Sequence, residues 1–387
     1  MKFNHSVRGK IADYGTMIFS EVSQLFNEYR AIDLSRGFPN FKQNDVLTGF
    51  LKKHVEEERN NYISINGHAN LRRHISEIIG RRYGTTYDPK HEVTITAGAS
   101  QAIYTVLSTL IRENDEVLIF EPSYDLFAPT IEINQGKPIY IKLEQPTFTI
   151  DWEKVQKLIT PKTRMIILNN PHNPTGSILK AHDFDELQRI VNGTDIMILS
   201  DESLQSLVYD GYEHHSVAKY KALAERSFIV GSFGKIFQIT GWRVGYCMAP
   251  EDLMHEFRKL HQYIAFNVNT PAQFALADYL GTGIDIDAIT NEFAQRRDYF
   301  AGLLQNTPFT PLKVKSGIFQ PVTYENKDNL SDKDVALKLI RECGVAGVPL
   351  SAYSHSKTNF GIIRFCFARP QSVIDEAAQK LAAFQID

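Results

Sequence analysis

Short, continuously apolar runs recur through the middle of the chain and predict buried β-strands. The runs are EVLIF ending at Phe120, PIYIKL from Pro138, MIILN from Met165, IMILS from Ile196 and FIVGSF from Phe228. Most of them do not alternate apolar with polar residues, and this is the pattern of strands that are covered on both faces.

Stretches with helical periodicity separate these runs. In AHDFDELQRIV from Ala181 and SQAIYTVLSTLI from Ser100, apolar residues recur at the spacing that places them on one stripe of a helix. Alternating strands and helices predict an α/β fold, with a largely parallel sheet and helices on both of its faces. In such sheets, ligands bind beyond the carboxyl ends of the strands.

The pattern changes near Glu292 and predicts a second, smaller α+β domain. The helical stretch NEFAQRRDYFAGLLQ precedes FTPLKVKSGIFQPV, and DKDVALKLIRECG precedes IIRFCFA. The length of 387 residues also favours one large domain and one smaller domain. We expect an N-terminal arm with part of the small domain over residues 1–44, a large domain over 45–280 and a C-terminal small domain over 281–387. The arm contains a predicted helix from Ile11 to Ala31, and we expect it to pack with the C-terminal part.

Composition and charge narrow the possible partners. The formal net charge of −3 and the pI of about 6.5 give no basic footprint for nucleic acid or for an anionic membrane. The N-terminus, MKFNHSVRGK, lacks the apolar region of a signal peptide, and we see no apolar run long enough to span a bilayer. The three cysteines, Cys247, Cys343 and Cys366, are far apart. This argues against a disulfide framework or a metal site and favours the reducing cytoplasm.

Polar residues that can carry chemistry follow several of the predicted strands. IMILS runs into Asp201, FIVGSF runs into Gly234 and Lys235, and MIILN runs into NPHNPTG. The stretch between Asp201 and Lys235 leaves room for one helix and one strand. If their strands are neighbours, both side chains emerge at the same edge of the sheet.

A lysine, an aspartate and several anion-binding groups at one sheet edge fit pyridoxal phosphate. The lysine amine condenses with the aldehyde of this cofactor, and an ionised aspartate keeps the ring nitrogen protonated. TAGASQA from Thr96 follows the strand EVTIT and opens a helix, whose first amides can bind a phosphate. Ser232 and Arg243 can add a hydroxyl and a guanidinium.

Each of these features also has an ordinary interpretation on its own. Lys235 fits a surface lysine, Asp201 a helix N-cap, NPTG a turn and Arg364 a partner in a salt bridge. Their joint occurrence in one order along the chain favours the cofactor site.

Five stretches carry a resemblance to a known family: ILNNPHNPTG, GSFGK, TGWRVGYC, FNVNTPAQFALAD and IRFCFA. In this order they resemble the class I/II aminotransferases of fold type I, over nearly the whole chain. The last two stretches are most similar to bacterial methionine aminotransferases and to kynurenine–oxoglutarate aminotransferases. The resemblance implies pyridoxal 5′-phosphate as the cofactor, a mostly parallel sheet in the large domain and a homodimer with shared active sites.

The resemblance also implies roles for individual residues. Lys235 matches the lysine that bonds to the cofactor and later moves the substrate proton. The residues implied to bind the cofactor are Asp201 at the ring nitrogen, Asn173 at the ring 3′-oxygen, Tyr124 against the ring face, Gly98, Ala99, Ser100, Ser232 and Arg243 at the phosphate, and Tyr62 at the phosphate of the partner subunit. The residues implied to lie at the substrate are Arg364, which binds the α-carboxylate bidentately, Asn173 and the backbone of Gly37.

One position departs from the family motif. The family usually has SDEVY, with a tyrosine that donates to the ring 3′-oxygen, where this chain has SDESL and therefore Leu204. Leu204 cannot donate a hydrogen bond, and one such bond to a charged group is worth roughly 1.5–3 kcal/mol. We expect a working enzyme with an altered pH profile. Ser203 and a water molecule are the two candidates to replace the missing donor.

The amino donor is the next question. Phe19, Tyr62, Phe266 and Asn269 are candidates to line the side-chain pocket, although such residues also fit ordinary core or interface positions. We see no second basic residue placed for an acidic side chain. We therefore expect a neutral, fairly large donor, such as methionine, an aromatic amino acid or kynurenine, whose amino group passes to a 2-oxo acid by a ping-pong mechanism. Two alternatives stay open, a carbon–sulfur β-lyase that acts on cysteine conjugates and a cofactor-binding sensor without turnover.

Overall fold

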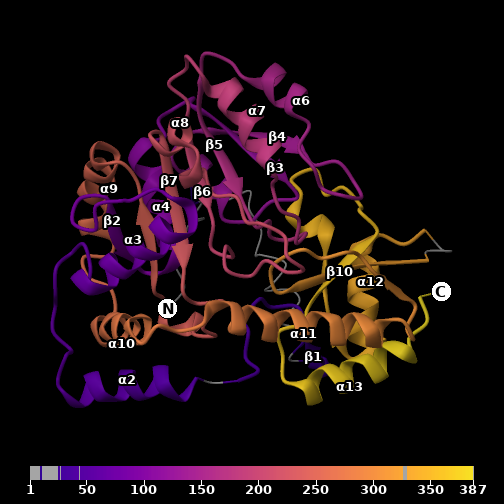
Figure 1. The fold of residues 1–387 in the computed structure, drawn as a ribbon. Coiled ribbons are helices and arrows are strands. Elements are labelled where there is room, and N and C mark those ends of the chain that lie inside the picture. The colour runs from indigo at the N-terminus through magenta and orange to yellow at the C-terminus, as the bar shows by residue number, and fades with distance from the viewer. Residues whose placement is uncertain (1–8, 11–24, 27, 43, 326–328, 387) are drawn as a thin grey trace, which may run out of the picture.

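The computed structural model describes residues 9–10, 25–26, 28–42, 44–325 and 329–386. Within these ranges the strands form a seven-stranded sheet, a four-stranded sheet and a two-stranded pair (Figure 1). No helix of the described residues is both long and apolar enough to cross a membrane.

The large sheet is mostly parallel, as the sequence predicts, and has the strand order β2-β8-β7-β6-β5-β3-β4. Its strands are β2 (Val93–Thr96), β3 (Glu116–Glu121), β4 (Lys137–Lys142), β5 (Thr163–Asn169), β6 (Met197–Asp201), β7 (Ser227–Ser232) and β8 (Gly245–Met248). Neighbours among β3 to β7 are parallel, whereas β8 runs antiparallel to both β2 and β7. Each of the five apolar runs coincides with one of these strands.

Helices cover both faces of this sheet (Figure 1). One face carries α4 (Gly98–Leu110), α5 (Phe127–Ile133) and α9 (Glu251–Ile264), and the other carries α3 (Ala69–Tyr83), α6 (Trp152–Leu158), α7 (Ala181–Val191) and α8 (Lys221–Ala224). In β5, Met165 and Ile167 pack with the first group, while Ile166 and Leu168 pack with the second. Successive side chains of a strand point to opposite faces, so a strand buried on both sides is apolar at every position.

The connection between β7 and β8 returns the chain directly beside its own strand. Antiparallel neighbours can be joined in this way, whereas parallel neighbours need a crossover. Ser232 at the end of β7 pairs with Gly245 at the start of β8. Both ends of the connection, residues 233–244, therefore lie at the same edge of the sheet. The sequence analysis did not predict β8.

The C-terminal part has mixed helices and antiparallel strands, as expected. Its helices are α11 (Ile286–Leu304), α12 (Asp332–Lys338) and α13 (Gln371–Ala382), and its sheet contains β9 (Phe309–Pro311), β10 (Phe319–Tyr324), β12 (Val348–Pro349) and β13 (Ile362–Cys366). Helix α11 begins before the predicted change near Glu292, because the side chain of Asp285 accepts a hydrogen bond from the amide of Ala288 and caps it.

The N-terminal arm packs with this C-terminal part through β1 (Ile32–Asp33), which pairs in parallel with β11 (Val345–Ala346). Of the helix predicted from Ile11 to Ala31, residues 11–24 and 27 lie outside the described residues, and Ala31 follows the helical turn rather than belonging to it. Farther along, α2 (Asp45–Glu56) lies against α10 (Thr270–Gly281) (Figure 1). The domain boundaries stay a prediction.

Candidate functional site

The ends of β6 and β7 bring Asp201 and Lys235 to one edge of the sheet, as the sequence predicts. The two strands are parallel neighbours, and Asp201 pairs with Val230. Asp201 is itself the last residue of β6, whereas the sequence analysis placed it after the strand. Lys235 lies in the connection between β7 and β8, just beyond the end of β7.

Asp201 is buried and is held by the residue two positions later. Its Oδ1 accepts hydrogen bonds from the amide of Ser203 at 3.1 Å and from the Ser203 hydroxyl at 2.5 Å. Burial raises the pKa of the Asp201 carboxyl, and the bonds from Ser203 and the charge of Lys235 act against that rise. Among the described residues, no donor bonds the Oδ2 atom, which is therefore available to a ligand.

Lys235 is partly buried, and its Nζ donates a hydrogen bond to the backbone carbonyl of Gly37. Burial lowers the pKa of Lys235 to about 8, and the positive charges of Arg243, Arg364 and Arg369 also favour the neutral amine. An amine with this pKa is partly unprotonated near neutral pH, as a nucleophile or a base must be.

A candidate anion-binding turn forms where α4 begins. The N-terminus of this helix has no side-chain cap, so its first amides are open to a ligand. Gly98 has φ +78°, and a Cβ there would lie 2.7 Å from an Nη atom of Arg243. Glycine therefore lets the guanidinium lie against the first turn. The Ser100 hydroxyl lies 3.5 Å from the hydroxyl of Tyr124.

Gly245 joins this turn to the connection that carries the lysine. A Cβ at Gly245 would lie 2.7 Å from the carbonyl oxygen of Gly231, 2.8 Å from the carbonyl carbon of Gly98 and 2.9 Å from the amide nitrogen of Ala99. The missing side chain lets β8 approach the start of α4 closely. Ser232, which pairs with Gly245, thus reaches the same edge as Ala99.

Arg364 lies on β13, and its side chain has only neutral partners. The residue is 1% exposed. One Nη donates to the side-chain oxygen of Asn173 at 2.9 Å and the other to the carbonyl of Ser35 at 3.2 Å, while Nε has no hydrogen-bond partner. The guanidinium carbon lies 3.6 Å from the ring centroid of Phe319. In the described part of the chain no ion pair neutralises Arg364, and a buried guanidinium of this kind suits a ligand carboxylate.

Asn169, which the sequence analysis missed, ties Asn173 to the end of β6. Its side-chain oxygen accepts from the amide of Asn173 at 2.8 Å, and its Nδ2 donates to the carbonyl of Asp201 at 3.2 Å. Asn173 then reaches across to Arg364. The NPHNPTG segment therefore links the groups predicted for the cofactor to the arginine predicted for the substrate.

Another missed residue is Asp125, which directly follows the predicted Tyr124. Burial raises the pKa of the Asp125 carboxyl, and the charge of Arg364 acts against that rise. Burial also raises the pKa of the Tyr124 phenol, which is near enough to Asp201 and Arg243 to sense their charges. Together with its contact to the Ser100 hydroxyl, this places Tyr124 beside the first turn of α4.

Tyr62 does not join this cluster within the described chain. Its side chain is 78% exposed, and its ring packs edge to face on Phe266 with centroids 5.1 Å apart. Its contact with a partner subunit stays a prediction. Of the other pocket candidates, Asn269 caps α10 by accepting from the amide of Ala272, and Phe19 lies outside the described residues.

The structure decides one of the options raised by Leu204. The single hydroxyl proton of Ser203 is donated to Asp201, so Ser203 is not free to replace the missing phenol. Leu204 is 6% exposed and borders a cavity of about 280 Å³, which Phe237 and Tyr246 also line. Of the two candidates, only water then remains to replace the missing donor.

The residues of the site fit pyridoxal phosphate group by group. The uncapped turn at Gly98 and the guanidinium of Arg243 suit the phosphate, and the unbonded oxygen of Asp201 suits a protonated ring nitrogen. The amine of Lys235 suits the aldehyde. This complementarity rests on the buried carboxylate and the glycine turn of this structure.

Comparison with known proteins settles the family. The sequence profile of the family described as "Aminotransferase class I and II" matches residues 29–381. The chain is a class I and II aminotransferase. Enzymes of this family depend on pyridoxal phosphate, so the aminotransferase uses this cofactor.

Relatives of the aminotransferase match it from end to end. It is 37% identical over 375 residues to a methionine aminotransferase of Escherichia coli, with 97% of each chain covered. It is 29% identical to a kynurenine–oxoglutarate transaminase of Dictyostelium discoideum, with 98% of this chain and 97% of the relative covered. A solved Escherichia coli structure with a methionine aminotransferase function superposes with a TM-score of 0.93 at 36% identity, over 98% of this chain and 100% of the other. The fold type I architecture is therefore confirmed.

Proposed function

We propose that the aminotransferase moves the amino group of a large, neutral amino acid to a 2-oxo acid, with methionine as the first donor to test. The observation that carries this proposal is that the other arginines around Lys235 already have partners or proposed roles, which leaves Arg364 for a substrate carboxylate. Arg243 lies at the anion-binding turn, Arg36 pairs with a neighbouring aspartate, and Arg369 donates to three backbone carbonyls. Arg364 differs from these three because it is buried, its Nε has no hydrogen-bond partner, and no charged side chain pairs with it in the described part of the chain.

One carboxylate site suits a donor with one carboxylate. An acidic side chain would need a second cation, because a buried charge without a partner is costly. The partly buried carboxyl of Asp125, which senses the charge of Arg364, makes the site less favourable still for a second negative charge. The described part of this chain therefore favours a neutral side chain.

The names of several relatives support this donor class. Besides the methionine aminotransferase, they include an aromatic-amino-acid aminotransferase of Thermococcus litoralis that is 30% identical over 370 residues. An aspartate aminotransferase of Sulfolobus acidocaldarius is 28% identical. Family membership alone does not choose between these donors, so the arginine arrangement is the deciding argument.

The cofactor would be held by groups from both sides of the sheet edge. We propose the phosphate contacts at Gly98, Ala99, Ser100, Ser232 and Arg243, and the ring contacts at Asp201, Tyr124 and Asn173. When bound, pyridoxal phosphate supplies an aldehyde that takes up amino groups and a ring that withdraws electrons from the substrate α-carbon. The bonds from Ser203 help to keep Asp201 ionised, which a protonated ring nitrogen requires.

Arg364 and Lys235 would divide the work on the substrate. Arg364 binds the α-carboxylate bidentately and fixes the position of the α-carbon. Lys235, whose pKa is lowered to about 8, would accept the proton from the α-carbon as a general base and later release it as a general acid. The first 2-oxo acid leaves before the second binds, and the same residues then act in reverse order.

A comparison of donors tests the proposal. With one 2-oxo acid in excess, we expect kcat/KM for methionine to exceed that for aspartate by roughly 100-fold, because aspartate would lack a partner worth about 3 kcal/mol. Equal or faster turnover of aspartate would refute the neutral-donor proposal. Release of pyruvate and ammonia from a cysteine conjugate without any 2-oxo acid would instead indicate a carbon–sulfur lyase.

We also propose that the aminotransferase is a homodimer and works in the cytoplasm. The exposed aromatic residues Tyr62, Tyr263 and Phe266 suit a subunit interface, because exposed apolar groups of this size usually mark one. The three cysteines are unpaired, as is typical of a reducing compartment. Cell fractionation checks the compartment, and light scattering checks the dimer.

A further inference from the structure

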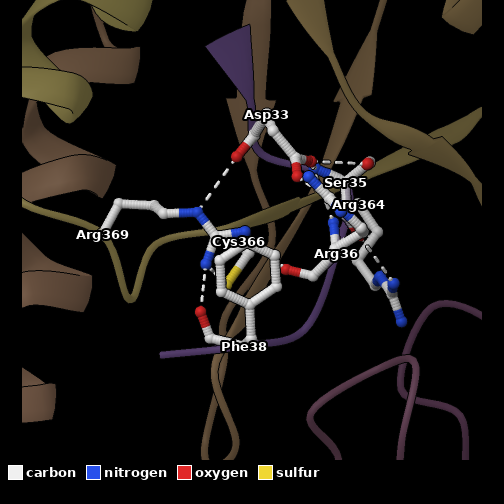
Figure 2. A network of polar contacts seen from close by, with 7 residues as sticks. All are labelled: Asp33, Ser35, Arg36, Phe38, Arg364, Cys366 and Arg369. Carbon is white, nitrogen blue, oxygen red and sulfur yellow. Dashed lines mark hydrogen bonds and ion pairs between the residues drawn. The ribbon is translucent and has the colours of Figure 1, made fainter. Parts of the chain in front are cut away.

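Arg369 follows β13 and binds the main chain of the N-terminal segment Asp33–Phe38. The residue is 3% exposed. Its Nε donates to the carbonyl of Asp33 at 3.0 Å, one Nη donates to that of Arg36 at 2.6 Å, and the other donates to that of Phe38 (Figure 2). The guanidinium carbon also lies 4.0 Å from the ring centroid of Phe38. The planar, five-donor guanidinium suits such an arrangement, whereas a lysine amine does not.

The oxygen acceptors of Arg369 are backbone carbonyls, and in the described part of the chain no carboxylate pairs with it. Its bonds therefore fix where the main chain lies and do not neutralise a charge. Burying an arginine without an acidic partner costs free energy unless its donors are bonded. We therefore ask what the segment Asp33–Phe38 contributes to the site when Arg369 holds it in this position.

Two other carbonyls of the segment face the site. The carbonyl of Ser35 accepts from Arg364 at 3.2 Å, and the carbonyl of Gly37 accepts from Lys235. They alternate with the carbonyls of residues 36 and 38, which face Arg369. Holding one set toward Arg369 turns the other set toward the arginine and the lysine of the site.

The segment has little room to settle elsewhere. A Cβ at Gly37 would lie 2.5 Å from Cζ of Phe319, whose ring is the surface on which Arg364 lies. A shift of the segment would therefore disturb both the ring below Arg364 and the carbonyl bonded to it. The position of the guanidinium and the position of the segment depend on each other.

We propose that Arg369 is a positioning residue for the α-carboxylate site. Arg369 holds the segment Asp33–Phe38 in place, and the Ser35 carbonyl of that segment keeps Arg364 oriented for an incoming carboxylate. The proposal rests on the proposed role of Arg364 in binding the substrate carboxylate. Arg369 itself touches neither the substrate nor the reacting atoms.

The test is Arg369→Lys in the cofactor-loaded enzyme. This change keeps the positive charge but loses the three-carbonyl contact. We expect KM for the amino donor and for the 2-oxo acid to rise roughly 10-fold or more, with kcat within about threefold, because misplacement of a binding group weakens substrate binding first. A variant whose KM values equal those of the natural protein overturns the proposal.

Arg226→Lys is the matched control. One Nη of Arg226 also donates to three backbone carbonyls, those of Val191, Thr194 and Ile196, ahead of β7 and away from the site edge. We expect it to lower stability in a similar way and to leave KM unchanged. If both variants raise KM alike, Arg369 acts only on stability and the proposal fails.

Two readouts do not depend on turnover. The Kd of α-methylmethionine, which lacks the α-hydrogen, should rise with KM in Arg369→Lys. In the cofactor-free protein, hydrogen exchange should become faster at the amides of Leu34 and Asn40, which bond to Ala346 and Ala368. Unchanged exchange at both amides would contradict the proposal.

Two further variants keep the test decisive. If Arg369→Lys does not fold, Phe38→Leu removes the ring under the guanidinium, and we expect a smaller rise in KM of roughly threefold. Arg364→Met separates the two levels of the argument. If it leaves the Kd of α-methylmethionine unchanged, the proposed carboxylate site is wrong, whereas an effect of Arg364→Met without one of Arg369→Lys refutes only the inference about Arg369.

Discussion

At the scale of a single residue, we expect Leu204 to change the chemistry of the site. It occupies the position of a hydrogen-bond donor in the family motif, and the hydroxyl of the neighbouring Ser203 donates its hydrogen bond to Asp201. If the proposed cofactor contacts are right, Asn173 and water are the donors that remain for the ring 3′-oxygen. Because that oxygen is negatively charged when the bound cofactor loses its proton, a missing donor favours the protonated form.

We predict that Leu204→Tyr lowers the pKa at which the visible absorbance of the bound cofactor titrates. The restored hydrogen bond to a charged oxygen is worth roughly 1.5–3 kcal/mol, which corresponds to about 1–2 pH units. The cavity of about 280 Å³ beside Leu204 offers room for the larger side chain. The measurement is a spectral titration of the cofactor-loaded protein.

Leu204→Phe is the control for size without the hydroxyl. It should leave the titration close to that of the natural protein, so that the shift belongs to the hydrogen bond. If Leu204→Tyr and the natural protein titrate at the same pH, the missing phenol has no influence on the bound cofactor.

Sequence reasoning found the residues whose type and place follow from strand ends and motifs. Asp201 and Lys235 were predictable because the apolar runs before them had to be buried strands. The bond between Ser203 and Asp201 was not predictable, because it depends on one side-chain rotamer. Arg369 gave no signal either, since its acceptors are backbone carbonyls more than three hundred positions earlier in the chain.

At the scale of elements, the site depends on the close approach of β8 to the first turn of α4. We predict that Gly245→Ala weakens the binding of pyridoxal phosphate to the cofactor-free protein by roughly 10-fold or more and lowers its stability by about 1–3 kcal/mol. The new Cβ would meet backbone atoms of Gly231, Gly98 and Ala99 at 2.7–2.9 Å, and backbone cannot move aside as a flexible side chain can. Cofactor titration and urea unfolding measure the two effects.

Gly302→Ala is the matched control for this change. Gly302 lies in α11, and no atom lies within 4 Å of a Cβ there. Alanine is a better helix former by about 1 kcal/mol, so we expect equal or higher stability and unchanged cofactor binding. Natural cofactor affinity in Gly245→Ala would show that β8 does not shape the phosphate site.

The fold was predictable to the extent that burial alone decides it. Strands β3 to β7 each contain at least three consecutive apolar residues, and helices such as α7 carry a clear apolar stripe. Strand β8 is only four residues long, and it runs antiparallel to both of its neighbours, β2 and β7. The direction of a strand depends on the strands beside which it lies, and the sequence pattern of the strand itself carries no information about those neighbours.

At the scale of the whole molecule, we predict a homodimer in which Tyr62 serves the site of the partner subunit. Tyr62→Ala should lower kcat/KM roughly 10-fold or more, because one bond to a charged phosphate is worth about 1.5–3 kcal/mol. Lys235→Ala should be inactive. When the two variants are unfolded together and refolded, mixed dimers contain one site with both natural residues, so activity should return.

Light scattering gives the mass of the natural protein, and two distinguishable tags report whether mixed dimers form. Mixed dimers without recovered activity would show that Tyr62 acts on the site of its own subunit. A monomer of full activity would contradict the shared site altogether. The exposure of Tyr62 at 78% is the structural reason to expect the first result.

Because the oxygen acceptors of Arg369 are neutral carbonyls, this residue affects the electrostatics of the site. A carboxylate partner would have cancelled the charge of Arg369, whereas neutral carbonyls leave nearly all of it in place. That charge is one of those that, after burial itself, lower the pKa of Lys235. The guanidinium of Arg369 thus favours the neutral form of Lys235, and this electrostatic effect acts through the protein interior without a direct contact between the two side chains.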